Sequence, residues 1–89
     1  MANAHIISEQ DDVAVVIQQV EAGETVKWHG AQGEQTIVAT GNIPIYHKIA
    51  LRDIKKGEAV LKYGNPIGWA TVEINKGTHV HIHNLESIQ

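Results

Sequence analysis

The sequence predicts a single all-β domain, built from short strands and tight turns with at most one short helical turn. A seven-residue unit centred on glycine recurs at 20–26, 54–60 and 74–80, and each copy has the form of a β-turn that opens into a strand. Residues 79–83 alternate histidine with an apolar side chain, which is the two-residue period of a strand. Because 89 residues is the size of one domain, residues 1–89 are expected to form one unit.

The repeated unit begins with a branched apolar residue, has glycine at its fourth position and ends on valine. Glycine can adopt the positive φ that a tight turn requires, and valine favours the strand that follows. The spacing between the units is too irregular for a solenoid, in which each repeat stacks on the next. The units therefore predict a shared local geometry within one compact β domain.

The rest of the chain supplies further strands and the connections between them. Apolar and β-branched runs predict strands at 5–7, 13–17, 35–39, 60–63 and 67–72. The glycines of segment 30–33 are typical of a hairpin turn. Pro44 lacks a backbone donor, so residues 41–51 are expected to form an extended edge or crossing strand. Residues 51–53 are the place for the one helical turn.

Composition and charge restrict the possible function. The chain has no cysteine, which excludes disulfides, thiolate metal sites and a thiol nucleophile. The net charge is −3 and the seven Lys and Arg residues are spread thinly, so nucleic acid is not an expected partner. No apolar run reaches the length that spans a bilayer, and no signal peptide pattern opens the chain. We therefore expect a cytoplasmic protein that does not contact a membrane.

The clearest candidate for a binding site is the histidine-rich segment near the C-terminus. On a strand, His79, His81 and His83 share one face, with neighbouring residues on that face about 6.6 Å apart. Imidazoles at this spacing can turn toward one metal ion or one anionic ligand. Val80 and Ile82 are then expected to face the core. The alternative is that the histidines are solvated side chains on the outer face of a half-buried strand.

Two further pairs of residues stand out. His47 and Lys48 offer an imidazole and a cation, which together suit a ligand with a carboxylate, although neighbours on a strand point to opposite faces. Alternatively, Lys48 is a solvated charge on an edge strand. Trp28 and His29 are expected at the rim of a hairpin, where a tryptophan serves packing or partner contact. The glycine-rich loops of nucleotide sites and the serine of a nucleophile elbow do not occur.

The segment from 43 to 85 contains a combination of motifs that is specific when taken together. His47-Lys48-Ile49-Ala50-Leu51, Lys62-Tyr63-Gly64 and His81-Ile82-His83-Asn84 occur in this order. The chain closely resembles the small SAF-type domain of the altronate and galactarate dehydratase family, which includes the small subunits of sulfolactate sulfo-lyase. The resemblance implies a SAF-type β-clip, a long twisted hairpin folded on itself. It also implies a cytoplasmic lyase of sugar-acid catabolism that acts with a large subunit.

The resemblance also implies the chemistry and the site. It predicts a substrate-capping subunit of a metal-dependent dehydratase, which eliminates water from a sugar acid to leave a 2-keto-3-deoxy acid. The divalent metal, Fe²⁺ or Mn²⁺, would be shared with the large subunit or held mainly by it. The implied site consists of catalytic His47, Lys48 and Lys62, of substrate-binding Tyr63 and Asn84, and of the metal ligands His79, His81 and His83.

Two alternatives remain open beside the dehydratase. In one, the chain is the small subunit of (2R)-sulfolactate sulfo-lyase, which expels sulfite instead of water. In the other, it is a free-standing SAF module that binds a ligand without catalysis. As a subunit without its partner, the isolated chain could self-associate through the surface meant for that partner, which makes a homo-oligomer a possible state.

Overall fold

The chain forms nine short antiparallel strands. The computed structural model describes residues 3–6, 11–30, 33–62 and 64–87, and these contain no helix. The strands are β1 (Ala4–His5), β2 (Val13–Val16), β3 (Thr25–Gly30), β4 (Gly33–Val38), β5 (Lys48–Ala50), β6 (Ala59–Lys62), β7 (Asn65–Ala70), β8 (His79–Val80) and β9 (Leu85–Ser87). The all-β prediction is confirmed. In the described part of the chain there is accordingly no helix that could span a membrane.

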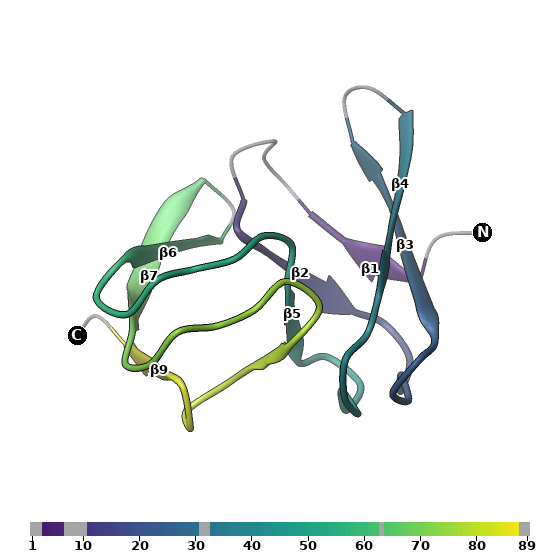
Figure 1. Cartoon of the computed structure of the whole chain (residues 1–89). Helices are drawn as coiled ribbons and strands as arrows, with labels where there is room; N and C mark the ends of the chain where they lie inside the picture. The colour runs from purple at the N-terminus through teal and green to yellow at the C-terminus, as the bar shows by residue number, and fades with distance from the viewer. Residues whose placement is uncertain (1–2, 7–10, 31–32, 63, 88–89) are drawn as a thin grey trace.

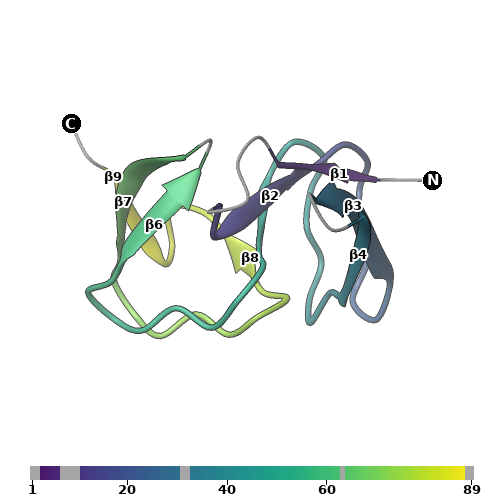
Figure 2. The same ribbon diagram turned by 90° about the horizontal axis from the view of Figure 1, so that it is seen from above.

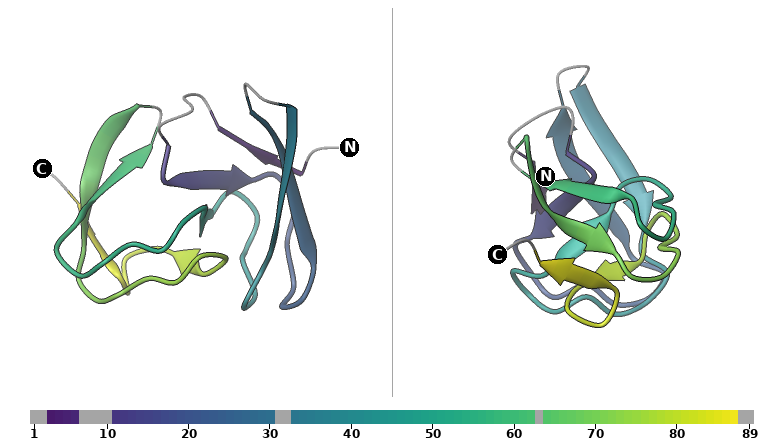
Figure 3. Two further views of the ribbon diagram at one scale, coloured as in Figure 1. Left: turned by 45° about the horizontal axis from the view of Figure 1, so that its top comes forward. Right: turned by 90° about the vertical axis from the view of Figure 1, so that its left-hand side faces the viewer.

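The strands form three small sheets. A four-stranded sheet has the order β1-β2-β5-β8, the β3–β4 hairpin forms a second sheet, and β6-β7-β9 form the third. Figures 1 and 2 show the β3–β4 hairpin at one end of the molecule and the β6-β7-β9 sheet at the other, with β2 between them. The left view of Figure 3 shows the same division across β2. The predicted hairpins around 30–33 and between 60–63 and 67–72 are both present.

Two apolar clusters fill the space on either side of the central strands. Ala14 and Val16 of β2 face one cluster, while Val13 of the same strand faces the other. Ile49 and Ala50 of β5 divide in the same way. A strand buried on both faces must be apolar at every position, which explains the continuous apolar run at 13–16. The central sheet is therefore a rigid base for the residues at its ends.

One turn geometry occurs four times in the structure. In the three glycine units, Gly23, Gly57 and Gly77 have φ values of 89°, 88° and 90°. The residue after each glycine donates its backbone N–H to the carbonyl three positions earlier, as in a type II turn. The fourth turn covers residues 44–47, where Tyr46 has a φ of 67° and the His47 N–H donates to the Pro44 carbonyl at 3.0 Å.

This fourth turn corrects the expectation of one extended strand over 41–51. Only Lys48–Ala50 is a strand, and β5 lies inside its sheet between β2 and β8. Pro44 has no N–H to donate, but the first position of this turn uses only its carbonyl, so proline is accepted there. Residues 51–53 form a bend and no helical turn.

The sheets are tied together by a buried carboxylate. Asp12 is 5% exposed, and its Oδ1 accepts from Arg52 Nε at 2.6 Å while its Oδ2 accepts from the Leu61 N–H at 2.9 Å. Asp11 accepts from the Gly64 N–H at 2.7 Å in the same region. Asp11 and Asp12 directly precede β2, whereas Leu61 belongs to β6 and Gly64 follows it, so these two backbone contacts fix the β6–β7 hairpin against the central sheet.

The structure places Trp28 in the core. Its side chain is 8% exposed and packs in the apolar cluster next to β2, whereas His29 is exposed. The expectation of a tryptophan at the hairpin rim is therefore wrong, and its packing alternative holds. Alternation along β3 sends Val26 and Trp28 to the covered face.

Candidate functional site

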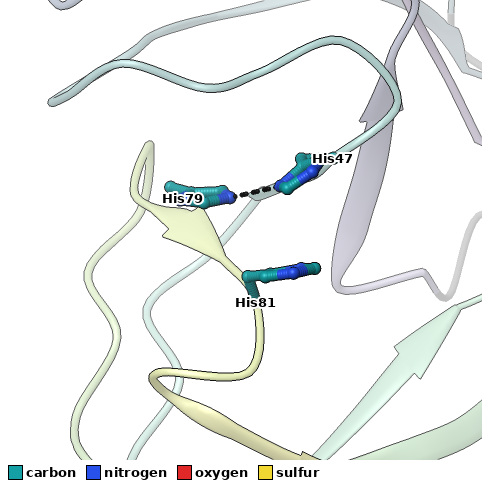
Figure 4. Close-up of side chains that lie close together, drawn as sticks. All are labelled: His47, His79 and His81. Carbon is teal, nitrogen blue, oxygen red and sulfur yellow. Dashed lines mark hydrogen bonds between the residues drawn. The ribbon is translucent and has the colours of Figure 1, made fainter.

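Strand pairing brings three histidines together. β5 and β8 are antiparallel neighbours, with Lys48 opposite Val80 and Ile49 opposite His79. Continuing this register places His47, at the end of its turn, beside His81. The His47 and His81 rings are stacked with centroids 4.3 Å apart, and His47 Nδ1 lies 2.9 Å from His79 Nε2. Figure 4 shows His47 and His79 facing each other, with the His81 ring on one side of the pair.

The three imidazoles offer a set of metal donors. One ring nitrogen from each of His47, His79 and His81 lies within 4.8 Å of the other two, and all three side chains are half-buried. We refer to these three residues as the histidine cluster. Their nitrogens suit iron, manganese, zinc and other divalent ions, and three protein ligands would leave positions open for a substrate. The donor set therefore fits the metal that the sequence resemblance implies.

The His47–His79 hydrogen bond has a consequence for metal binding. One of the two facing nitrogens must carry the proton and the other must accept it. A metal ion between these rings would take the place of that proton. Metal binding at the histidine cluster therefore competes with protonation, as for any imidazole ligand.

His83 is not part of this donor set. Its ring lies beside that of His79, with centroids 5.2 Å apart, but its side chain is exposed and it is not one of the three converging donors. Sequence reasoning placed His79, His81 and His83 on one strand and gave His47 a catalytic role. The structure instead brings His47 next to His79 and His81. Only the β5–β8 register could have revealed this, since His47 and His79 are 32 positions apart.

A turn at residues 81–84 ends the strand before His83. Asn84 is 4% exposed, and its Oδ1 accepts from the His81 N–H at 2.9 Å while its Nδ2 donates to the His79 carbonyl at 2.8 Å. These bonds replace sheet pairing after Val80, so β8 ends there. Ile82 is consequently 81% exposed, and the expectation that it faces the core with Val80 is wrong. Asn84 thus holds the backbone of two members of the histidine cluster, His79 on β8 and His81 just after it.

Positive charge and burial shape the electrostatics of the site. Burial first, and then the neighbouring His47, His83, His81 and Lys48, lowers the pKa of His79 from 6.5 to about 4. The pKa of His81 is lowered by the same two kinds of effect. Burial and the nearby Lys62 lower the pKa of Lys48. The side chains that shift these three pKa values are other histidines and the lysines Lys48 and Lys62, and no carboxylate is among them, although the whole chain has a net charge of −3.

The other predicted site residues lie around this centre. Lys48 begins β5 next to His47 and is half-buried, which sets it apart from a solvated edge charge. Lys62 ends β6 and is near enough to Lys48 to affect its pKa. Tyr63 lies outside the described residues. Sequence reasoning missed Tyr46. An alignment of residues 43–49 with the three glycine units would have shown that Tyr46 occupies the position of the glycine.

Comparison with known proteins identifies the family. The sequence profile of the altronate/galactarate dehydratase SAF domain matches residues 2–88. The chain belongs to this family. Altronate dehydratase of Bacillus subtilis (strain 168) is 36% identical over 81 residues, which are 91% of this chain and 16% of that protein. Altronate dehydratase of Escherichia coli (strain K12) is 42% identical over 77 residues, or 86% of this chain and 15% of that protein.

A third relative in the SAF family is itself a small protein. The (2R)-sulfolactate sulfo-lyase subunit alpha of Chromohalobacter salexigens is 35% identical over 86 residues, which cover 92% of each chain. The chain therefore spans 15% to 16% of the two altronate dehydratases but most of this subunit. The relatives are named as lyases or as a lyase subunit, and the SAF domain occurs in both settings.

Proposed function

We propose that this SAF domain is the substrate-capping subunit of a metal-dependent acid-sugar dehydratase, completed by a large catalytic subunit. The histidine cluster supports this proposal more than any other observation, because it joins three converging imidazoles to a surrounding set of cations. The imidazoles suit a divalent metal, and the cations suit the carboxylate of an acid substrate. The names of the relatives supply the reaction class, which is β-elimination.

Elimination next to a carboxylate requires three groups. A base removes the proton on the carbon next to the carboxylate, an electrophile stabilises the resulting enolate, and an acid protonates the leaving group. A bound Fe²⁺ or Mn²⁺ supplies the electrophile. The chain's own residues hold that ion through His47, His79 and His81 and attract the substrate carboxylate through Lys48. The base and the acid then come chiefly from the large subunit.

His79 is suited to act as a ligand at neutral pH. A pKa of about 4 keeps its imidazole neutral well below pH 7, so a lone pair is available for a metal. Lys48 is half-buried in the presence of a second cation, and a carboxylate would relieve the repulsion between them. Both features favour a complex of metal and anionic substrate over either one alone.

Co-expression with a candidate large subunit tests the proposal. The purified complex is assayed with altronate, galactarate and sulfolactate in the presence of Fe²⁺ or Mn²⁺. We expect turnover that needs both chains and that falls at least about a hundredfold for His81→Ala, the lower end of what a positioned catalytic group contributes. His5→Ala is the matched control, because His5 is exposed on β1 and outside the cluster.

The same assay distinguishes the alternative functions. Sulfite release from sulfolactate would assign the chain to the sulfo-lyases, and the match over 92% of a sulfo-lyase subunit favours that candidate. A large subunit that neither binds this chain nor gains activity from it would refute the role in catalysis. In that case the free-standing ligand-binding module is the better account.

A further inference from the structure

The 44–47 turn differs from its three counterparts at the two positions next to the site. Each turn donates a backbone N–H to a buried strand residue, and Tyr46 donates to the Val16 carbonyl at 2.8 Å as Gly23 does to Ala39. The counterparts have glycine where this turn has Tyr46. Two of them follow the glycine with a glutamate, and the Oε1 of Glu24 or Glu58 accepts a turn N–H at 2.6 Å. Here the residue is His47, whose ring belongs to the histidine cluster.

The fold itself gives no reason for a tyrosine at this position. A φ of 67° is unfavourable for any residue with a Cβ, whereas glycine adopts it without strain. The Tyr46 side chain is 70% exposed, so little of it packs against the protein. The backbone N–H that the turn uses would be present in glycine as well. The chain therefore tolerates backbone strain for a side chain that points away from its core.

Backbone strain of this kind is concentrated at functional sites, where the surrounding structure holds a residue in place. Tyr46 directly precedes His47, so its backbone lies next to the histidine cluster, at the end of the sheet where β5 begins. The residues assembled there are imidazoles and lysines, which are cationic or neutral nitrogen groups. A phenol adds a neutral hydroxyl that can donate to a carboxylate or accept from a sugar hydroxyl.

We propose that Tyr46 contacts the acid substrate bound at the histidine cluster and contributes to substrate specificity through its phenol hydroxyl. This inference rests on the proposed function, because it needs an acid ligand at the cluster. It adds a substrate-contacting residue that the motif match did not include. Its backbone strain distinguishes Tyr46 from Ile82, which is more exposed but has no positive φ.

Three variants of the co-expressed complex test this inference. Tyr46→Gly removes the side chain and the strain together, Tyr46→Phe removes only the hydroxyl, and Gly57→Tyr places a tyrosine in an equivalent turn away from the cluster. We expect Tyr46→Gly to raise KM for the acid substrate at least tenfold, and Tyr46→Phe to raise it by a smaller factor. Subunit affinity should stay at the wild-type value. Gly57→Tyr should leave KM unchanged.

Thermal unfolding of the same three variants separates function from folding. Tyr46→Gly should unfold at the same or a higher temperature than the wild type, and Gly57→Tyr at a lower one. A lower midpoint for Tyr46→Gly would mean that the tyrosine serves the fold, which overturns the inference. An active complex in which Tyr46→Gly keeps the wild-type KM, or changes only subunit affinity, overturns it as well. A wild-type complex without turnover of any of the acids overturns the proposed function, and the inference with it.

Discussion

His47 Nδ1 and His79 Nε2 lie 2.9 Å apart although the two residues are separated by 32 positions in the chain. The contact exists because β5 and β8 pair in a single register, so that the turn before β5 and the start of β8 meet at one end of the sheet. His81 stacks on His47 at the same place. This arrangement is the basis of the following predictions.

The histidine cluster should bind a divalent ion in the isolated chain. Co²⁺ is a suitable probe, because its absorption bands report coordination and it binds nitrogen ligands more tightly than Mn²⁺ or Fe²⁺. We expect His47→Ala, His79→Ala and His81→Ala each to weaken binding at least about tenfold, since even the groups that orient metal ligands contribute this much. His83→Ala should have a smaller effect. An equal loss for His83→Ala would show that the ligands are those of the sequence prediction.

Stability should fall in weakly acidic solution, partly because of His79. Its pKa in the folded chain is about 4, below the ordinary value of 6.5, so the unfolded chain binds more protons between these two values. Lowering the pH through this window therefore favours unfolding. Thermal unfolding midpoints at pH 7.0, about 5.5 and about 4.5 measure the effect, because the first pH lies above the ordinary imidazole pKa and the other two lie below it. The decrease should be smaller for His79→Gln, and an identical decrease would assign it to other groups.

Asp12→Ala should destabilise the fold strongly. The substitution leaves the Leu61 N–H and the Arg52 guanidinium without their buried acceptor, at an expected cost of about 2–4 kcal/mol in the free energy of unfolding. Urea unfolding measures this cost. The exposed Glu73→Ala is the control and should change stability by less than about 0.5 kcal/mol. A loss for Asp12→Ala as small as that of the control would show that the network contributes little.

Asn84→Ala should affect both stability and metal binding. The side-chain amide of Asn84 holds the backbone at His79 and His81. Its loss releases the end of β8 and the turn that follows, at a cost of about 1–3 kcal/mol in the free energy of unfolding. Co²⁺ affinity should fall together with stability, because two ligands lose their fixed positions. Gln18→Ala removes an exposed amide and should change neither. A destabilised Asn84→Ala variant with normal Co²⁺ affinity would show that this turn does not position the metal ligands.

Gly68 should not tolerate alanine. A Cβ at this position would lie 2.0 Å from the backbone oxygen of Glu86, so β7 and β9 would have to separate. We expect a loss of about 1–3 kcal/mol or more in the free energy of unfolding, as for other overpacked sites. Gly41→Ala is the matched control, because no atom lies within 4 Å of its added Cβ. Equal stability of the two variants would contradict the close approach of β7 and β9.

The amino-acid sequence by itself determined the fold class, the three glycine turns and the residue types of the site. Local rules suffice for these features, because a positive φ selects glycine and alternation of side chains selects strands. The family resemblance added Lys62, Tyr63 and Asn84 to the candidates. Each of these conclusions depends on residues near one another in the chain or on a motif.

Only the tertiary structure decided which histidines meet. Strand register between β5 and β8 is set by burial across the whole sheet, so no local pattern reveals that His47 joins His79 and His81. The end of β8 depends on the hydrogen bonds of Asn84, which replace sheet pairing beyond Val80 and leave Ile82 exposed. The strain at Tyr46 appears only once its backbone is compared with that of the glycine turns. Contacts between distant segments generally depend on the whole fold, so the sequence of any one segment does not determine their geometry.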